Sequence, residues 1–252
     1  MTIGERLWKT FNKALGQYQL IDEDDHILVG LSGGKDSLLL LEFLARRSKI
    51  HVPHFTVEAL HVRMDFAIQQ PDMPSANTHY ETDTSYLQHF CEQLSIPLHI
   101  ITTSFDGSPK PHTKQKPPCF LCSWERRKQL FNVAQELHCT KIALGHHQDD
   151  IIHTALMNLT FQGHFSTMPV LLRMKKMPLT IIRPLCLCHE DDIRLYAKEH
   201  HYEKQLKLCP YEHETNRATA RELFARMEQQ LNPEARYCIW RALESYNKLT
   251  EY

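Results

Sequence analysis

Hydrophobic and polar residues follow two patterns along this chain: short apolar runs, and longer segments with apolar residues three or four positions apart. The short runs are bounded by turn residues and predict buried β-strands, while the wider spacing predicts amphipathic helices that cover them. Five strands are predicted, at His26–Leu31, Val57–Val62, Leu98–Thr102, Lys141–Leu144 and Thr180–Ile182.

Helical segments separate most of these strands. Strands that alternate with helices imply right-handed crossovers and a parallel sheet covered on both faces. We therefore expect an α/β fold, namely a Rossmann-like parallel five-stranded sheet with helices on both faces, plus C-terminal helices. The predicted helices cover Glu5–Leu15, Leu38–Arg47, Thr84–Leu94, Ile151–Leu159, Glu212–Gln229 and Pro233–Lys248, and a further one begins near Ser123.

The length of 252 residues suits one large domain with helical additions. We expect an N-terminal helix in residues 1–24, the main α/β domain in residues 25–205 and a C-terminal helical segment, packed on it, in residues 206–252. Apolar residues make up 42% of the chain, which excludes disordered and fibrous classes. Because no apolar run approaches the ~18 residues of a membrane span and no secretory signal opens the chain, we expect a cytoplasmic protein with no membrane partner.

The segment Ser32–Ser37, with the sequence Ser-Gly-Gly-Lys-Asp-Ser, carries the strongest chemical signal. It ends a strand and opens a helix, which gathers backbone N–H groups at the positive end of the helix dipole. Glycines let a phosphate approach the main chain, Lys35 adds a positive charge, and the serines offer hydroxyl donors. The segment predicts a polyphosphate site; the alternative is a tight turn capped by Asp36.

This segment resembles the PP-loop of N-type ATP pyrophosphatases. The resemblance extends to Gly145–Asp150, after the fourth predicted strand, and to Ile182–Leu185. It implies a fold of the PP-loop adenine nucleotide α-hydrolase type and an enzyme that cleaves ATP between the α- and β-phosphates and adenylates a substrate oxygen. The implied nucleotide-binding residues are Ser32, Gly33, Gly34, Lys35, Asp36, Ser37 and Gly145.

Two adjacent carboxylates, Asp149 and Asp150, begin the helix that follows the fourth strand. Ligands of parallel sheets bind at this edge, so one carboxylate can cap the helix while the other holds magnesium or orients an attacking group. The alternative is that both only cap the helix. For His146 and His147 we favour packing and backbone support over catalysis. The predicted catalytic residues are Lys35, Asp36, Arg126, Asp149 and Asp150, with Mg²⁺ shared by Asp36 or the aspartate pair.

The pair Cys119 and Cys122 lies at the end of a proline-rich stretch, near the start of a predicted helix. The helix N-terminus and the nearby Arg126 favour thiolates. From the residues alone, four interpretations stay open: an iron–sulfur site, a zinc site, a redox dithiol or two core cysteines. Structural zinc prefers four protein ligands, and Cys186 and Cys188 are spaced poorly for that role.

In the cysteine region the sequence is similar to tRNA 2-thiocytidine synthetases, in which a C-x-x-C followed by Ser and an Arg-Arg pair supplies two ligands of a 4Fe-4S cluster. The resemblance implies that Cys119, Cys122 and Cys209 hold such a cluster. It further implies ATP-dependent thiolation of a cytidine in the tRNA anticodon loop, with a cysteine desulfurase as sulfur donor. The other five cysteines match nothing in the motif and are interpreted as core or incidental thiols.

Binding of tRNA requires local positive charge, because the whole chain has 29 basic and 30 acidic residues. A basic cluster can meet phosphates, and Phe120 or Trp124 can stack on an exposed base. The alternative is an ordinary solvated surface. The cluster consists of Lys110, Lys114, Lys116, Arg126, Arg127 and Lys128.

Two other functions stay open. One is a PP-loop ligase or amidase that acts on a small molecule and carries structural zinc; the other is a nucleotide-binding module without catalysis. In the favoured mechanism Arg126, one helical turn after Cys122, stabilises the charge of the adenylate. Dimerisation of the chain is left open.

Overall fold

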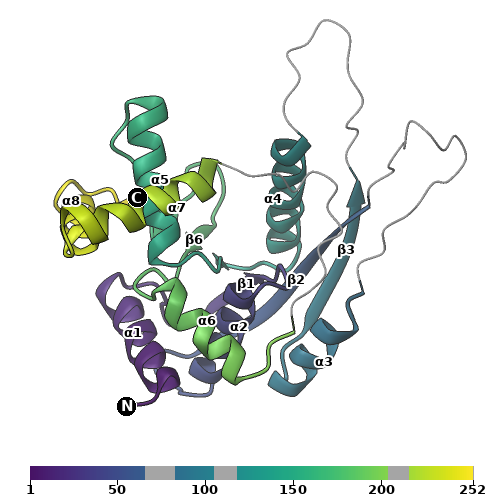
Figure 1. The fold of residues 1–252 in the computed structure, drawn as a ribbon. Helices are drawn as coiled ribbons and strands as arrows, with labels where there is room; N and C mark the ends of the chain where they lie inside the picture. The colour runs from purple at the N-terminus through teal and green to yellow at the C-terminus, as the bar shows by residue number, and fades with distance from the viewer. Residues whose placement is uncertain (66–82, 105–117, 204–215, 252) are drawn as a thin grey trace, which may run out of the picture.

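A seven-stranded sheet runs through the part of the chain that the computed structural model describes, residues 1–65, 83–104, 118–203 and 216–251 (Figure 1). The strands are β1 (Asp25–Gly30), β2 (Phe55–Asp65), β3 (Leu98–Ser104), β4 (Lys141–Ala143), β5 (Leu171–Arg173), β6 (Thr180–Ile182) and β7 (Thr250–Glu251).

The strand order is β3-β2-β1-β4-β6-β5-β7, and the first five strands in this order are parallel. The predicted α/β class is thus confirmed, but the predicted number of five strands is wrong. The two additional strands extend one edge: β5 pairs antiparallel with β6, and β7 pairs with β5. β7 has only two residues, and β5 pairs antiparallel with β6 with no helix between them, so neither fits the alternation of strands and helices on which the prediction was based.

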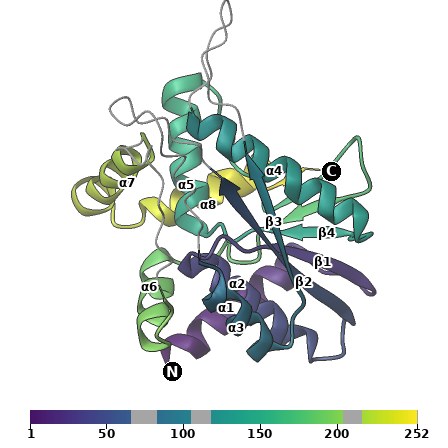
Figure 2. The ribbon, with the colours of Figure 1, turned by 90° about the vertical axis from the view of Figure 1, so that its right-hand side faces the viewer.

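Helices cover both faces of the sheet, with α4 on one face and α1, α2 and α3 on the other (Figure 2). None of the described helices is long and apolar enough to cross a membrane. The helices are α1 (Ile3–Gln17), α2 (Lys35–Ser48), α3 (Ser85–Leu94), α4 (Pro118–Glu136), α5 (Gln148–Met157), α6 (Glu190–Glu199), α7 (Asn216–Arg226) and α8 (Ala235–Ser245), with π-helical turns η1 (Asn158–Gln162) and η2 (Met227–Leu231).

Strand β1 shows why the sheet needs helices on both faces. Ile27 and Val29 belong to the hydrophobic cluster under α1 and α2, whereas Leu28 belongs to the cluster under α4. All three side chains are fully buried. A strand that buries successive side chains on opposite faces is typical of the interior of a parallel sheet.

The N-terminal helix α1 is fixed to the core by its apolar face. Its N-terminus has a capping box between Thr2 and Glu5. Further along, Phe11 packs edge-on against Phe43 of α2, which in turn contacts Tyr196 of α6. Helix α1 therefore completes a core that also involves α6.

The C-terminal helices pack on α5 and α1. Phe224 of α7 is buried and its ring contacts that of His153 in α5. In α8, the Trp240 indole N–H donates to the hydroxyl of Tyr18, which itself donates to Glu244 at 2.7 Å. The predicted start of the first C-terminal helix, Glu212, lies outside the described residues. The three-part division of the chain stays a prediction.

Candidate functional site

The candidate site lies where the strand order reverses. β1 has β2 on one side and β4 on the other, and the chain continues from β1 into α2 and from β4 into α5 (Figure 2). In open parallel sheets, ligands bind at such a point, beyond the carboxyl ends of the strands. Two of the segments singled out from the sequence, Ser32–Ser37 and Gly145–Asp150, meet here.

The Ser32–Ser37 loop is held in shape by its own serines. The Ser37 hydroxyl donates to the Gly34 carbonyl at 2.9 Å and accepts from the Ser32 N–H at 3.2 Å, while the two serine hydroxyls lie 3.1 Å apart. Gly33 has φ +78°, a conformation that glycine adopts without strain. Gly34 is the N-cap of the 14-residue helix α2. The loop is therefore a preformed cradle at a helix N-terminus, which suits a phosphate group.

Gly145 brings the second segment into contact with this cradle. A Cβ atom placed on Gly145 would lie 3.0 Å from Asp36 C and Ser37 N, and 3.1 Å from Asp36 O. These are backbone atoms of the first turn of α2 and cannot swing aside as a side chain can. Only glycine therefore allows the two loops to approach this closely.

Replacement of Gly145 by alanine is expected to separate the two loops by a few tenths of an ångström. We expect ATP affinity to fall at least ~10-fold and the free energy of unfolding to fall by about 1–3 kcal/mol. Equilibrium dialysis with labelled ATP and urea denaturation measure the two effects. Gly16→Ala is the matched control, because a Cβ there meets nothing within 4 Å and the helical position favours alanine. Equal ATP affinity in the two variants would contradict the close-approach argument.

Lys35 lies between two carboxylates at the mouth of the cradle. Its ammonium nitrogen is 3.0 Å from Asp36 Oδ1 and 3.4 Å from Glu190 Oε1. Glu190 also pairs with Arg221 of α7 at 3.0 Å. Burial raises the pKa of Glu190, but the charges of Lys35 and Arg221 outweigh burial and hold it below its usual range. Glu190 and Arg221 were not predicted from the sequence.

His147 is buried among three carboxylates. Its ring nitrogens lie 3.4 Å from Asp150, 3.5 Å from Asp149 and 3.9 Å from Asp36. Burial lowers the pKa of His147, but these carboxylates more than reverse that effect and raise it. The site therefore favours the protonated imidazole, which holds the aspartates together. From the sequence we predicted packing and backbone support for His147, and its interaction with three carboxylates was not part of that prediction.

The two adjacent aspartates have different partners. Asp149 pairs with Arg236 of α8 at 2.7 Å and accepts the backbone N–H of Glu190 at 2.9 Å. Burial acts to raise its pKa, but His147 and Arg236 hold the pKa of Asp149 well below its usual range. Asp150 accepts the backbone N–H of His147 at 3.2 Å and so caps the first turn of α5. Asp149 thus connects the site to the C-terminal helices.

Helix α4 presents cations near the same edge of the sheet. Arg126, Arg127 and Lys128 are exposed, while Glu125 is buried and accepts from the Thr103 hydroxyl at 3.0 Å. Burial lowers the pKa of Arg183, with the charge of Arg127 adding to the effect, to about 10. Arg183 follows β6, so the cations of α4 act on the carboxyl end of the sheet. The other three members of the predicted basic cluster, Lys110, Lys114 and Lys116, lie outside the described residues.

Among the predicted cluster ligands, Cys119 and Cys122 lie in the first turns of α4 and Cys209 is outside the described residues. The Cys122 side chain is half-buried. Burial raises the pKa of Cys139 and of Cys188 to about 12, so both are thiols rather than thiolates at neutral pH. Such groups are poor metal ligands, which agrees with their interpretation as core residues.

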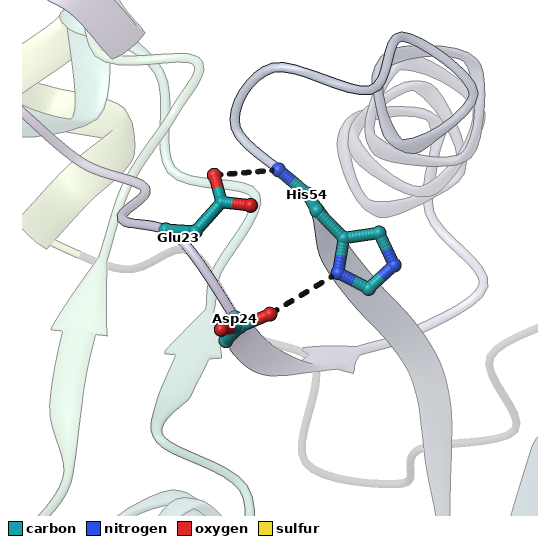
Figure 3. A group of neighbouring side chains, drawn as sticks. All are labelled: Glu23, Asp24 and His54. Atoms are coloured by element: carbon teal, nitrogen blue, oxygen red, sulfur yellow. Dashed lines mark hydrogen bonds and ion pairs between the residues drawn. The ribbon is translucent and has the colours of Figure 1, made fainter.

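A different group of potential metal ligands lies before β1 and β2 (Figure 3). Glu23 accepts the backbone N–H of His54 at 3.0 Å, and Asp24 lies 3.4 Å from the His54 ring. Within the described ranges no other set of three such residues lies close enough to hold one ion. All three residues are exposed and lie at the amino ends of the strands. We therefore interpret the group as a structural contact that joins the segments before β1 and β2.

Comparison with known proteins agrees with this geometry. Residues 5–223 match the model of the PP-loop domain. The chain therefore belongs to the PP-loop family, as its sequence motifs predict.

Within that family the chain is similar to tRNA-cytidine(32) 2-sulfurtransferases. It is 32% identical over 243 residues to the one from Pseudomonas syringae pv. syringae (strain B728a), covering 96% of this chain and 84% of the relative. It is 36% identical over 194 residues to that of P. syringae pv. tomato (strain ATCC BAA-871 / DC3000), covering 77% and 66%. Its structure resembles the U34-tRNA thiolase NcsA from Methanococcus maripaludis with its [4Fe-4S] cluster, with a TM-score of 0.75, 25% identity, and coverage of 97% of this chain and 79% of that one.

Proposed function

We propose that the protein is an ATP-dependent tRNA sulfurtransferase that adenylates a cytidine of the anticodon loop and replaces its 2-oxygen with sulfur. The observation that carries this proposal is the contact between the phosphate cradle and Gly145, because it builds an ATP site in a chain similar to tRNA-thiolating enzymes. A cysteine desulfurase is the proposed sulfur donor.

In the proposed mechanism the phosphates of ATP lie over Ser32–Ser37. Lys35 turns from Glu190 toward the phosphates, and Glu190 retains Arg221 as its partner. Asp36 Oδ1 is buried and receives no hydrogen bond from any described residue, although Lys35 lies nearby. A carboxylate oxygen in this state suits Mg²⁺, which prefers oxygen ligands and accompanies nucleotide phosphates. The residues present therefore fit Mg-ATP.

The first chemical step forms a bond between the cytidine 2-oxygen and the α-phosphorus and breaks the bond to the β-phosphate, which leaves as pyrophosphate. The oxygen is then part of an AMP ester, a much better leaving group. Lys35 and the backbone N–H groups of the cradle stabilise the charge that develops on the phosphates. Arg126, an exposed residue one helical turn after Cys122 in α4, is proposed to contact the adenylate.

The sulfur chemistry is assigned to Cys119, Cys122 and Cys209. The first two lie one helical turn apart at the N-terminus of α4, where the helix dipole favours thiolates. Three thiolates would leave one iron of a [4Fe-4S] cluster without a protein ligand, and that position would hold the incoming sulfide. All three ligand assignments stay predictions: Cys119 and Cys122 at the start of α4, and Cys209 outside the described residues.

Helix α4 also provides the surface proposed for tRNA. Phe120 and Trp124 are 46% and 51% exposed, which is high for large hydrophobic side chains. Lys128 lies over the Trp124 ring at 5.6 Å. Aromatic faces bordered by cations can stack on an unpaired base while phosphates are neutralised. Because Cys119 and Cys122 lie on the same helix, a base held there would be near the reactive thiols.

The test is nucleoside mass spectrometry of tRNA from cells that lack this protein, combined with pyrophosphate assays on anaerobically purified protein. We expect 2-thiocytidine to disappear in the deletion strain and return on complementation. Pyrophosphate release should require unmodified tRNA in addition to ATP. Unchanged 2-thiocytidine, together with a colourless zinc protein that releases pyrophosphate only with a small-molecule acceptor, would contradict the proposal in favour of a ligase.

A further inference from the structure

Arg236 of α8 reaches the candidate site from the C-terminal part of the chain. Its side chain is 18% exposed, and its Nη1 atom donates to Asp149 Oδ1 at 2.7 Å. Helix α8 lies against α5, the helix whose first turn contains Asp149 (Figure 2). The pair therefore joins a motif residue of the candidate site to a residue 87 positions further along the chain.

Two further contacts fix the orientation of the Arg236 guanidinium. Its Nε and Nη2 atoms donate to the two carboxylate oxygens of Glu228, at 3.1 and 3.2 Å. The guanidinium carbon lies 5.1 Å from the centre of the Phe224 ring, and that ring is buried against His153 of α5. A paired hydrogen bond to a carboxylate and a ring beneath it hold a guanidinium in one plane. The remaining Nη1 is thereby directed at Asp149.

Asp149 uses both of its carboxylate oxygens to hold neighbouring groups. Oδ1 accepts from Arg236, while Oδ2 accepts the backbone N–H of Glu190 at 2.9 Å and lies 3.5 Å from His147 Nδ1. Asp36 is different, because its buried Oδ1 accepts no hydrogen bond from any described residue. The engaged oxygens of Asp149 therefore suit the ordering of other residues, whereas the oxygen of Asp36 suits a metal ion.

The contact with Glu190 extends the effect of Arg236 to the phosphate cradle. Glu190 is the first residue of α6, so the carboxylate of Asp149 holds the first turn of that helix by its backbone. The side chain of Glu190 lies 3.4 Å from Lys35 Nζ. Loss of Arg236 would leave Asp149 buried without its closest cationic partner, which is unfavourable and allows the carboxylate to move. The start of α6 would then no longer be fixed in relation to Lys35.

We propose that Arg236 is a positioning residue for the adenylation reaction, an inference that rests on the proposed function. It holds Asp149 so that the first turn of α6, and with it Glu190, stays in place beside Lys35. A displacement of about 1 Å caused by a change far from the reacting atoms can cost ~10²-fold in rate, so a contact at this distance can control the chemistry. Helix α8 thus contributes to the reaction and not only to the packing of the C-terminal segment.

Single-turnover pyrophosphate release by Arg236→Gln, with saturating Mg-ATP and unmodified tRNA, tests the proposal. We expect the rate per folded molecule to fall ~10–100-fold while the half-saturating tRNA concentration stays within about twofold, because Arg236 acts on the site and not on the tRNA. Arg241→Gln is the matched control, since Arg241 is an exposed arginine of the same helix. A merely structural ion pair would lower the melting temperature of Arg236→Gln but not the rate of the molecules that stay folded.

A double-mutant cycle with Asp149→Asn tests whether Arg236 acts through this aspartate. We expect the double variant to be no slower than Asp149→Asn alone, since the arginine then has no carboxylate left to hold in the site. Losses that multiply would show that Arg236 acts by another route, and would overturn the proposal.

Glu228→Gln covers the case in which Arg236→Gln does not fold. The Glu228 side chain is 28% exposed, and its replacement leaves the pair of Arg236 with Asp149 in place while it weakens the contact that orients the guanidinium. This variant should slow pyrophosphate release ~3–10-fold, and an unchanged rate would overturn the positioning role.

Binding of Mg-ATP separates failure of this inference from failure of the proposed function. If the unaltered protein releases no pyrophosphate with tRNA, the proposed function fails, and equilibrium dialysis with labelled ATP then decides the role of Arg236. Arg236→Gln should weaken Mg-ATP binding at least ~5-fold relative to Arg241→Gln, because Lys35 and its partner Glu190 are no longer held in place. Equal ATP affinity of the two variants would in that case overturn the inference.

Discussion

Alanine at position 35 is expected to lower the rate of pyrophosphate release about 10²–10³-fold. Lys35 is the cation that lies beside the phosphate cradle, and loss of one preorganised electrostatic contact to a transition state costs about 2.7–4 kcal/mol. The measurement is single-turnover pyrophosphate release with saturating Mg-ATP and unmodified tRNA. Because the rate is measured under saturation, weaker ATP binding alone does not produce the expected loss.

The fold should survive this substitution. Glu190, one partner of Lys35, keeps Arg221 at 3.0 Å and Arg194 at 3.5 Å. Lys198→Ala is the matched control, since Lys198 is an exposed lysine in the last turn of α6. We expect both variants to melt at nearly the same temperature and only Lys35→Ala to lose activity. Activity of Lys35→Ala within twofold of the control would show that the cradle does not carry the chemistry.

The central part of the fold could be predicted because its signals are local. The five predicted strands are apolar runs ended by turn residues, and each is present within a few residues of its predicted place. The Ser32–Ser37 loop is likewise defined by six consecutive residues whose hydrogen bonds are mostly among themselves. That Gly145 belongs with this loop was implied by the family resemblance, and the structure shows the two in contact beyond the paired strands β1 and β4.

The electrostatic surroundings of the site could not be predicted in the same way. Asp149 and its partner Arg236 are far apart in the sequence, and no short pattern relates them. Helix α6 was also missed, since it opens with Glu190, Asp191 and Asp192 and has few apolar residues. Its signal was present: acidic residues favour the first turn of a helix, and buried positions follow at helical spacing. Because α6 was not predicted, its first residue Glu190, the second partner of Lys35, was not predicted as a site residue either.

Serine at position 122 is expected to abolish the iron–sulfur cluster while leaving ATP binding intact. Cys122 lies in α4, and the cradle lies after β1, so the substitution does not touch the loop that holds the phosphates. Removing one of three thiolate ligands should lower the iron content of anaerobically purified protein at least ~10-fold, and thiolation of tRNA should fall to background. Iron analysis, visible absorbance and equilibrium dialysis with ATP measure the three quantities.

Cys238→Ser is the control, because Cys238 is an exposed cysteine in α8 and its replacement tests whether any exposed thiol affects iron content. Only the variant in α4 should lose iron, since the dipole at that N-terminus favours the thiolate form that metals require. Retention of iron in Cys122→Ser would exclude this residue as a ligand. Zinc in place of iron in the unaltered protein, handled without oxygen, would instead favour the ligase and contradict the sulfur chemistry proposed for α4.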